Sequence, residues 1–246
     1  MKFVSIIIPY FKKKSFIDKT LRSIQNQIYS YYEIIIIYDD LDKDELNYLI
    51  QKTKKNKKIK ILVNSKNIGA GASRNRAIKV AKGDYIAFID ADDIWKKNKL
   101  KKQMSFMTKN NYEISHTSYE IINDKNKVIG KRTAKNLNFE KLLKSCDIGL
   151  STVVIKKKIL KKFKFAKLKT KEDYVLWLQL AKNGNTFYGL NQNLSFWRLS
   201  KNSLSSSIIR KLIDGYKVYR LYLNQGVVES FLSVINLSIN YLKKNA

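Results

Sequence analysis

The sequence predicts an α/β fold: a mostly parallel β-sheet flanked by helices, followed by a C-terminal helical tail. Four short apolar runs are near-continuous rather than alternating, which is typical of strands covered on both faces. Helical patterns separate these runs, and this repeated order favours parallel strands joined by right-handed crossovers. The four predicted strands span residues 3–8, 33–38, 60–63 and 85–89.

Three helical patterns lie between successive predicted strands. The first follows Ser15, whose hydroxyl together with Asp18 three residues later resembles a capping box. Its apolar residues recur at spacings of three and four: Ile17, Leu21, Ile24 and Ile28. The second carries Leu46, Leu49 and Ile50. The third spans residues 70–81, and Gly83 predicts its C-terminal end.

Polar side chains follow each predicted strand. The first strand ends at Pro9 and Tyr10, the second at Asp39 and Asp40, and the third at residues 64–71. Because the carboxyl ends of parallel strands share one edge, where ligands of such sheets bind, these residues predict a ligand crevice. Asp39 and Asp40 could instead only open a turn, as aspartate commonly does.

Three aspartates, Asp90, Asp92 and Asp93, follow the fourth predicted strand in GDYIAFIDADDIW. Carboxylates this close repel one another and raise one another's pKa, and a hard cation relieves the repulsion. Residues two apart on an extended chain point the same way, so Asp90 and Asp92 would share a face and could hold Mg²⁺ or Mn²⁺. The alternative is an N-cap for the basic helix predicted over residues 96–110.

The segment NSKNIGAGASRNRA follows a strand and opens a helix. Gly69 and Gly71 begin like a dinucleotide fingerprint, but Arg74 replaces the third glycine and the motif belongs on the first strand. Backbone amides at a helix N-terminus and the Arg74 guanidinium nevertheless both suit anions, so the loop could bind phosphate.

In the second half, strand-like segments at 117–123 and 128–133 flank a turn, and a loop enters a strand near residue 153. Glu172 and Asp173 then open a helix that Gly184 closes. Acidic residues there are ordinarily partners of the helix dipole, which would keep both ionised at neutral pH. An ionised carboxylate can also accept a proton from a sugar hydroxyl. The single histidine, His116, is expected in a half-buried strand.

The chain has 246 residues, of which 44% are hydrophobic, so it is expected to be globular. Its net charge is 49 − 20 = +29, which suggests an anionic partner: nucleic acid, a membrane face or a phosphorylated substrate. Lysine, asparagine and isoleucine are in excess together, as in AT-rich genomes, so no nucleic-acid partner is expected. Basic runs such as residues 12–14 are expected to be solvated.

Cys146 is the only cysteine, which excludes an intrachain disulfide and fits a reducing, cytoplasmic location. The N-terminal apolar stretch lacks a signal-peptide cleavage site. No apolar run approaches the ~20 residues that a membrane span requires.

The tail carries an apolar stripe at helical spacing: Val228, Phe231, Leu232, Ile235, Ile239 and Leu242. Most such stripes pack on their own domain. The alternative is that the stripe and the lysines hold the protein at the inner face of the plasma membrane as a peripheral contact.

Six motifs, taken in order, resemble those of glycosyltransferase family 2 enzymes with the GT-A fold: SIIIPYF at 5–11, Asp39 and Asp40, NIGAGASRN at 67–75, YIAFIDADD at 85–93, EDYVLWL at 172–178 and FWRLSKNSLS at 196–205. The resemblance covers about residues 1–207. It therefore predicts a GT-A domain over 1–207, with a Rossmann-like sheet, and a helical tail over 208–246.

The resemblance implies a metal-dependent, inverting transfer from a nucleotide-sugar donor, with a UDP-sugar expected, to a glycan or lipid-linked acceptor of cell-surface polysaccharide or lipopolysaccharide. It implies that Pro9 and Asp40 border the base, Asp90 the ribose, Asp92 binds Mn²⁺ or Mg²⁺ on the diphosphate, and Asp173 is the catalytic base. The further substrate-binding candidates are Tyr10, Asp39, Asn67, Gly69, Arg74 and Arg198.

Two departures from the family pattern stand out. First, DDLDKDE follows the second strand where many relatives have DDGSTD. Second, Ser200 stands where some relatives have histidine, so no third protein ligand to the metal is identified. Two other function classes stay open. A nucleotidyltransferase would normally show a glycine-rich loop after the first strand, where this chain has Pro9. A nonenzymatic anion- or RNA-binding module is favoured by charge alone.

Overall fold

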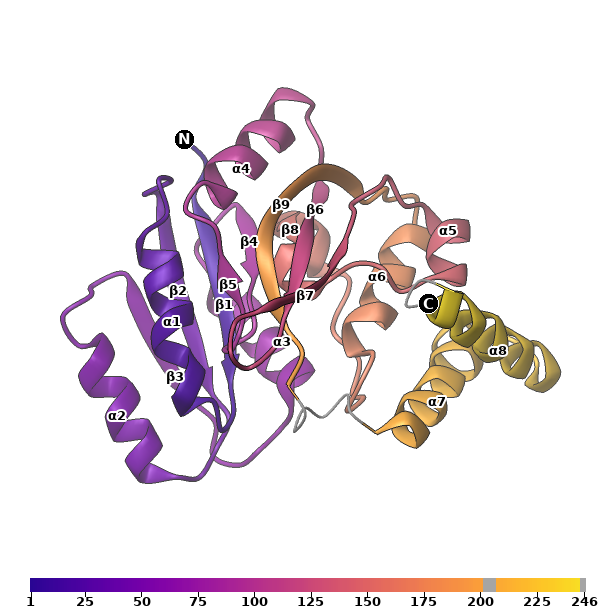
Figure 1. Ribbon diagram of the computed structural model, residues 1–246, viewed down its shortest axis with the longest axis horizontal. Helices are drawn as coiled ribbons and strands as arrows, with labels where there is room; N and C mark the ends of the chain where they lie inside the picture. Colours follow the sequence, from indigo (N-terminus) through magenta and orange to yellow (C-terminus); the bar gives the residue numbers. More distant parts are fainter. Residues whose placement is uncertain (201–206, 244–246) are drawn as a thin grey trace.

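The computed structural model describes residues 1–200 and 207–243; the end of the FWRLSKNSLS motif lies outside the described residues. The described chain builds one mixed β-sheet with helices on both faces and two helices, α7 and α8, at one end (Figure 1). Its strand order is β3-β2-β1-β4-β8-β6-β9-β5, with β7 paired to β6. The predicted α/β class is therefore confirmed.

The four strands predicted first are confirmed and pair in parallel, in the order β3-β2-β1-β4. They are β1 (Val4–Tyr10), β2 (Tyr32–Tyr38), β3 (Ile59–Val63) and β4 (Tyr85–Phe88). The later strands form the mixed half of the sheet. Strand β8 runs antiparallel to both of its neighbours, β4 and β6, whereas β9 runs parallel to β6. They are β5 (Ile94–Trp95), β6 (Ile114–Ile122), β7 (Val128–Arg132), β8 (Val154–Lys156) and β9 (Tyr188–Arg198).

Eight α-helices are described: α1 (Lys14–Gln25), α2 (Lys43–Thr53), α3 (Ala70–Val80), α4 (Lys99–Lys109), α5 (Phe139–Lys144), α6 (Glu172–Lys182), α7 (Ile208–Lys217) and α8 (Val227–Lys243). A π-helical turn, Val218–Tyr222, follows α7. Successive strand residues such as Ile6 and Ile7 enter opposite cores, one with α1 and α4 and the other with α3 and α6. Both faces are buried, which explains the near-continuous apolar runs.

Two local predictions at α1 are wrong. The helix begins at Lys14 with Lys13 as its N-cap and no side-chain capping bond, so Ser15 makes no capping box. The helix ends at Gln25, and Ile28 lies beyond it with 53% of its surface exposed. The Gln27 side chain donates to the Ser23 and Lys96 carbonyls, which turns the chain away before Ile28.

Gly83 does not end α3, whose C-cap is Ala81. A side chain at Gly83 would place its Cβ 2.5 Å from the Ser5 backbone nitrogen. The glycine is therefore required by the close approach of this loop to β1 rather than by a turn. His116, as expected, lies on a strand, where it is buried and its Nε2 is 2.9 Å from the Lys135 carbonyl oxygen.

The tail packs on the sheet domain, but not through the stripe that the sequence suggested. Helix α8 buries Ser230, Val234 and Leu237. The six stripe residues, Val228 to Leu242, are instead 45–72% exposed. The default expectation that the stripe packs on its own domain is therefore wrong, because the opposite side of the helix makes the contact. The boundary at 207/208 stays a prediction. No helix in the described part of the chain is long and apolar enough to cross a bilayer.

Candidate active site

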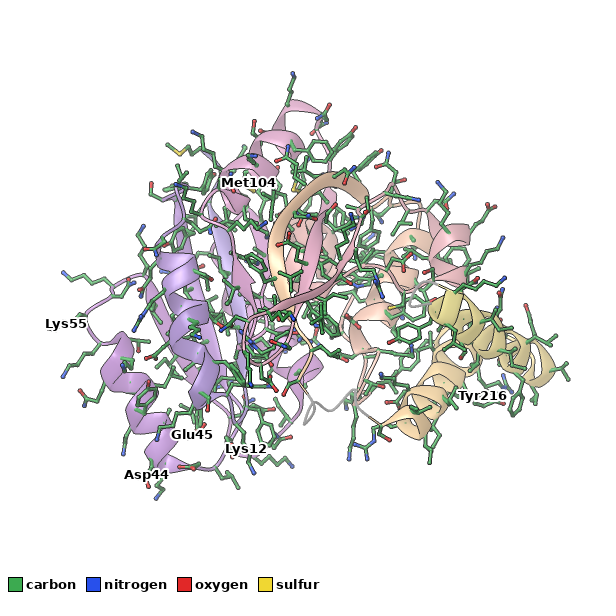
Figure 2. The ribbon with its side chains drawn as sticks, in the orientation of Figure 1. Lys12, Asp44, Glu45, Lys55, Met104 and Tyr216 are labelled. Atoms are coloured by element: carbon green, nitrogen blue, oxygen red, sulfur yellow. The ribbon has the colours of Figure 1, made fainter. Side chains whose placement is uncertain are left out.

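The carboxyl end of β1 lies at the lower edge of the sheet, near Lys12 and Glu45 in Figure 2. Tyr10 is fully buried there, donates its hydroxyl to Glu45 Oε2 at 2.6 Å and stacks on Tyr38. Burial and the Glu45 carboxylate raise the pKa of Tyr10 far above its ordinary value. Pro9 beside it is partly exposed. Pro9 is thus open to a ligand, whereas Tyr10 supports the edge from below.

Asp39 holds the loop between β3 and α3. Its buried carboxylate accepts Asn64 Nδ2 at 2.7 Å and the backbone N–H groups of Ile68 and Gly69 at 2.9 and 2.8 Å. Asn67 Nδ2 donates to the Asp39 carbonyl oxygen at 2.8 Å. Gly69 has a φ of 84°, which an L side chain rarely adopts. These hydrogen bonds shape the loop, and Asn67 stays exposed at its surface.

Asp40, the next residue, is differently placed. Its Oδ1 accepts the Leu41 N–H at 2.7 Å, while its Oδ2 is buried and has no hydrogen-bond partner among the described residues. A buried carboxylate oxygen without a donor is costly and is a natural acceptor for a ligand donor. Asp40, rather than Asp39, therefore has a carboxylate oxygen without a hydrogen-bond donor among the described residues.

The acidic segment after β4 is a turn, not an extended strand. Strand β4 ends at Phe88, and the Asp93 N–H donates to the Asp90 carbonyl oxygen at 3.1 Å. The premise that alternation along a strand places Asp90 and Asp92 on one face is therefore wrong. Burial raises the pKa of Asp92; the Lys13 ammonium opposes this rise, and the Asp90 carboxylate adds to it.

Asp93 has a structural role. It is only 1% exposed, accepts the Ser151 hydroxyl and accepts the Arg198 N–H at 2.8 Å. Burial, and then repulsion from Asp92 and Asp90, raises its pKa well above the ordinary value. Of the three aspartates, Asp93 therefore anchors the turn, whereas Asp90 and Asp92 are ion-paired with Arg74 and Lys13.

Arg198 fastens the same turn to the β6–β7 hairpin. Its buried guanidinium donates to the Asp92 carbonyl oxygen at 2.9 Å, the Asn123 carbonyl oxygen at 2.7 Å and Asn126 Oδ1 at 2.8 Å. It also lies over the Phe16 ring. The Nε, Nη1 and Nη2 nitrogens thus all donate to protein oxygens, which gives Arg198 a structural role beside the acidic turn.

Arg74 joins the acidic turn to the start of α6. Its Nη2 lies 2.7 Å from Asp90 Oδ1 and its Nη1 2.7 Å from Glu172 Oε1, and the guanidinium is buried above Phe165. Like Arg198, it is engaged by protein groups where a phosphate contact was expected. Gly71 permits this proximity, because a Cβ there would lie 2.9 Å from the Ala166 carbonyl oxygen and 3.0 Å from Glu172 Cγ.

Asp173, in the first turn of α6, is partly buried, and its Oδ1 accepts the Tyr174 N–H at 2.7 Å. Burial, and then the Glu172 charge, raise the pKa of Asp173 to about 7, while Arg74 opposes the rise. Burial therefore acts against the ionised form of Asp173 that the helix dipole was expected to favour. A carboxyl with this pKa suits proton transfer near neutral pH.

Lys13 is an ion-pair partner of Asp92 that the sequence did not reveal. Its Nζ lies 2.6 Å from Asp92 Oδ2, although the surrounding basic run was expected to be solvated. No local sequence pattern could indicate this ion pair, because Lys13 and Asp92 are 79 positions apart and belong to different loops.

The donor set suits a divalent ion only in part. The described residues contain no cluster of three His, Cys, Asp or Glu side chains. Mg²⁺ is commonly held by one or two carboxylates together with substrate phosphates, and Asp92 with Asp90 supplies that number. These residues therefore fit an ion that arrives with a diphosphate.

Comparison with known proteins identifies the family. Residues 5–169 match the model for "Glycosyl transferase family 2". The chain belongs to glycosyltransferase family 2. It is also 37% identical over 242 residues to the Escherichia coli protein WfgD, named as UDP-Glc:alpha-D-GlcNAc-diphosphoundecaprenol beta-1,3-glucosyltransferase, across 97% of this chain and 92% of that protein.

Two solved structures share the fold. The crystal structure of S. aureus TarS 1-349 in complex with UDP-GlcNAc superposes with a TM-score of 0.77 at 20% identity, covering 99% of this chain and 73% of that one. The mannosyltransferase PcManGT from Pyrobaculum calidifontis, in complex with GDP-Man and Mn²⁺, gives 0.70 at 11% identity, covering 96% and 73%. The predicted GT-A fold of this glycosyltransferase is thereby confirmed.

In this family 2 glycosyltransferase, two groups of predicted residues are brought together. Arg74 physically links Asp90 and the start of α6, where Asp173 lies, and Arg198 and Lys13 adjoin Asp92. The Asp39 loop forms a separate network in which Asn67 and Gly69 take part. The ligand roles of all these residues stay predictions.

Proposed function

We propose that this enzyme transfers a sugar from a UDP-sugar to a lipid-diphosphate-linked glycan, with inversion, and that Asp173 is the catalytic base. The observation that carries the proposal is the Asp90–Arg74–Glu172 linkage. It connects the acidic turn expected to meet the donor with the helix that bears a carboxyl of pKa about 7. One site thus contains an anion-facing side and a proton acceptor.

On the donor side, Pro9 and Asp40 border the base and Asp90 the ribose. The unpartnered Asp40 Oδ2 supports this assignment, because a base N–H would satisfy it. Asp92 would hold Mn²⁺ or Mg²⁺, which when bound supplies positive charge to a departing diphosphate. Lys13, already beside Asp92, adds a fixed positive charge at the same point.

On the acceptor side, Asp173 removes the proton of the attacking hydroxyl. Above about pH 7 its carboxylate is ionised and can accept that proton. Arg74 limits the rise of the Asp173 pKa, which would otherwise leave the base protonated. Removal of the proton makes the hydroxyl oxygen a better nucleophile toward the sugar carbon.

The acceptor class is supported by the comparison with WfgD, whose name specifies a sugar on diphosphoundecaprenol. By analogy we propose a polyprenyl-diphosphate-linked glycan used in cell-surface polysaccharide synthesis, met on the cytoplasmic side of the membrane. The UDP-GlcNAc complex of TarS supports a UDP-sugar donor, and the Mn²⁺ complex of PcManGT supports a metal-dependent site.

The test measures UDP release from a panel of UDP-sugars with Mn²⁺ and a synthetic lipid-diphosphate-linked GlcNAc acceptor. Asp173→Asn should lower turnover by about 100-fold or more, the usual contribution of a positioned base, while leaving UDP affinity within about twofold. Glu140→Gln is the matched control, because Glu140 also lies in the first turn of a helix but is exposed.

Undiminished turnover of Asp173→Asn would remove Asp173 from the catalytic role. Absence of UDP release with every donor and acceptor, together with absence of UDP binding, would contradict the transferase proposal. Release of diphosphate from a nucleoside triphosphate would instead favour a nucleotidyltransferase.

A further inference from the structure

Helices α7 and α8 present an apolar face to solvent. On α7 the exposed side chains are Ile208, Ile209, Leu212 and Ile213, with 43–73% of their surface accessible. On α8 they are the six stripe residues from Val228 to Leu242. The two sets adjoin, because the Tyr216 ring, labelled in Figure 2, lies 4.9 Å from the Phe231 ring. We call this surface the tail face; contiguous exposed apolar surface of this kind marks an interaction site.

The tail face is not needed to attach the tail to the domain. Helix α8 already does so through Val234 and Leu237, and Asn240 Nδ2 donates to the Lys144 carbonyl oxygen at 2.9 Å. The stripe lies on another side of the same helix at spacings of three, four and seven. Helix α8 therefore has one apolar side for its own domain and a second for something else.

Positive charge borders the tail face. A groove of about 550 Å³ beside α7 is lined by residues of both kinds: Lys167, Lys169, Arg210, Lys217, Ile209 and Ile213. Asp214 is its only acidic lining residue; it is buried, and Oδ2 accepts the Thr170 N–H and hydroxyl at 3.0 and 2.8 Å. Asp214 Oδ1 lies 4.0 Å from Lys217 Nζ, so the lining holds four cationic side chains and one carboxylate. Apolar side chains next to this excess of positive charge match acyl chains next to lipid phosphates.

We propose that the tail face lies in the interface of an anionic lipid bilayer, with α7 and α8 parallel to the membrane plane. The side chains of the tail face enter the acyl boundary, and the lysines and arginine contact the headgroups. This inference rests on the proposed function for its purpose, since a lipid-linked acceptor is delivered at a membrane. Its physical basis, the apolar and basic surface, is independent of the reaction.

The position of α7 fits this purpose. Asp214 of α7 accepts a hydrogen bond from the Thr170 N–H. Gly215 lies against the Lys171 side chain, since a Cβ added at Gly215 would be 3.6 Å from Lys171 Cε. Lys171 is the N-cap of α6, two residues before Asp173. A bilayer in contact with α7 is therefore close to the proposed base, where the sugar of a lipid-diphosphate acceptor would have to be held.

A second copy of the chain is the competing occupant. Two tail faces brought together would also bring their basic borders together, in a protein of net charge +29, and like charges repel. An anionic membrane has the complementary charge. Charge complementarity therefore favours the membrane.

The test is co-sedimentation of the full chain with vesicles of phosphatidylcholine alone or mixed with phosphatidylglycerol, at low and high salt. We expect binding to the anionic vesicles at least about 10-fold tighter than to the neutral ones, weakening with salt. The triple variant Phe231→Ser, Leu232→Ser and Ile235→Ser should lose at least about 10-fold of that affinity. The control Val128→Ser with Ile129→Ser, on β7 and 49–50% exposed, should not.

Absence of binding to anionic vesicles at low salt would overturn the proposal, and so would equal binding by a triple variant whose melting temperature matches that of the parent. Analytical ultracentrifugation that shows a dimer, lost in the triple variant, would assign the tail face to a second copy and also overturn it. Sugar transfer to a water-soluble acceptor separates the two proposals. Turnover without vesicle binding would contradict only the proposal that the tail face binds a membrane. Vesicle binding without turnover or UDP binding would contradict only the proposal that the protein transfers a sugar.

Discussion

Asp173→Asn should make the protein more stable at pH 8 while making it inactive. The pKa of Asp173 rises from 3.8 to about 7 on folding, so the ionised form is disfavoured in the native state. At about 1.4 kcal/mol for each tenfold change in proton affinity, this rise corresponds to at most about 4.5 kcal/mol. Asp173 is partly exposed, and we halve this figure for solvent screening to about 2 kcal/mol.

The sign follows from proton linkage. The unfolded chain loses the Asp173 proton near pH 3.8 and the native protein near pH 7, so stability falls as pH rises between these values. Asparagine carries no charge and can still accept the Tyr174 N–H. Urea unfolding at pH 8 should therefore show Asp173→Asn about 2 kcal/mol more stable than the parent, with little difference at pH 4.

The opposite result would refute this reasoning. If Asp173 were mainly a partner of the α6 dipole, its neutralisation would lower stability at pH 8 by about 0.3–1 kcal/mol. Glu172→Gln is the companion variant. Glu172 Oε1 lies 2.7 Å from Arg74 Nη1, and loss of the Glu172 charge should destabilise the protein. A stabilised Glu172→Gln, or an Asp173→Asn no more stable than the parent, would show that the charge distribution is not the one described.

Three further predictions test the rest of the site. Arg74→Met should lower the free energy of unfolding, measured in urea, by about 3 kcal/mol, because Asp90 and Glu172 lose their common buried partner. Arg74→Lys should restore less than half of this loss, since one ammonium cannot bind both carboxylates. A loss below about 1 kcal/mol in Arg74→Met would contradict the linking role of Arg74. Asp39→Ala should cost about 3 kcal/mol by urea unfolding, since three N–H donors lose a charged acceptor; an unchanged unfolding midpoint would be inconsistent with the anchor role. Asp92→Ala should abolish the Mn²⁺-dependent part of UDP affinity in calorimetry, and equal Mn²⁺ dependence in parent and variant would exclude Asp92 from the metal site.

Much of the site was predictable because it follows directly after strands. Asp40, Asp90 and Asp92 could be placed at one sheet edge from the strand order alone, since parallel strands share the direction of their carboxyl ends. The ionisation of Asp173 could not be predicted in this way. It depends first on burial, then on the neighbouring Glu172 and on Arg74, and both the burial and the position of Arg74 come from segments distant in the chain.

The arginines illustrate the same distinction. Their sequence context favoured anion binding, and the fold gave them anionic and carbonyl partners from within the protein. Arg74 meets Asp90 and Glu172, and Arg198 meets the Asp92 carbonyl oxygen, only after α3, α6 and β9 have packed. Lys13 meets Asp92 by the same route and left no trace in the local pattern.

The amino-acid sequence by itself determined the four parallel strands, the helices between them, the family and the order of the acidic motifs, because these depend on the spacing of neighbouring residues. Tertiary structure alone decided which aspartate is buried as an anchor, which carboxyl takes up a proton near neutral pH, and which side of α8 meets the domain. Solvent exposure and electrostatic partners come from segments distant in sequence, so periodicity shows that a helix has an apolar face but not what that face will contact.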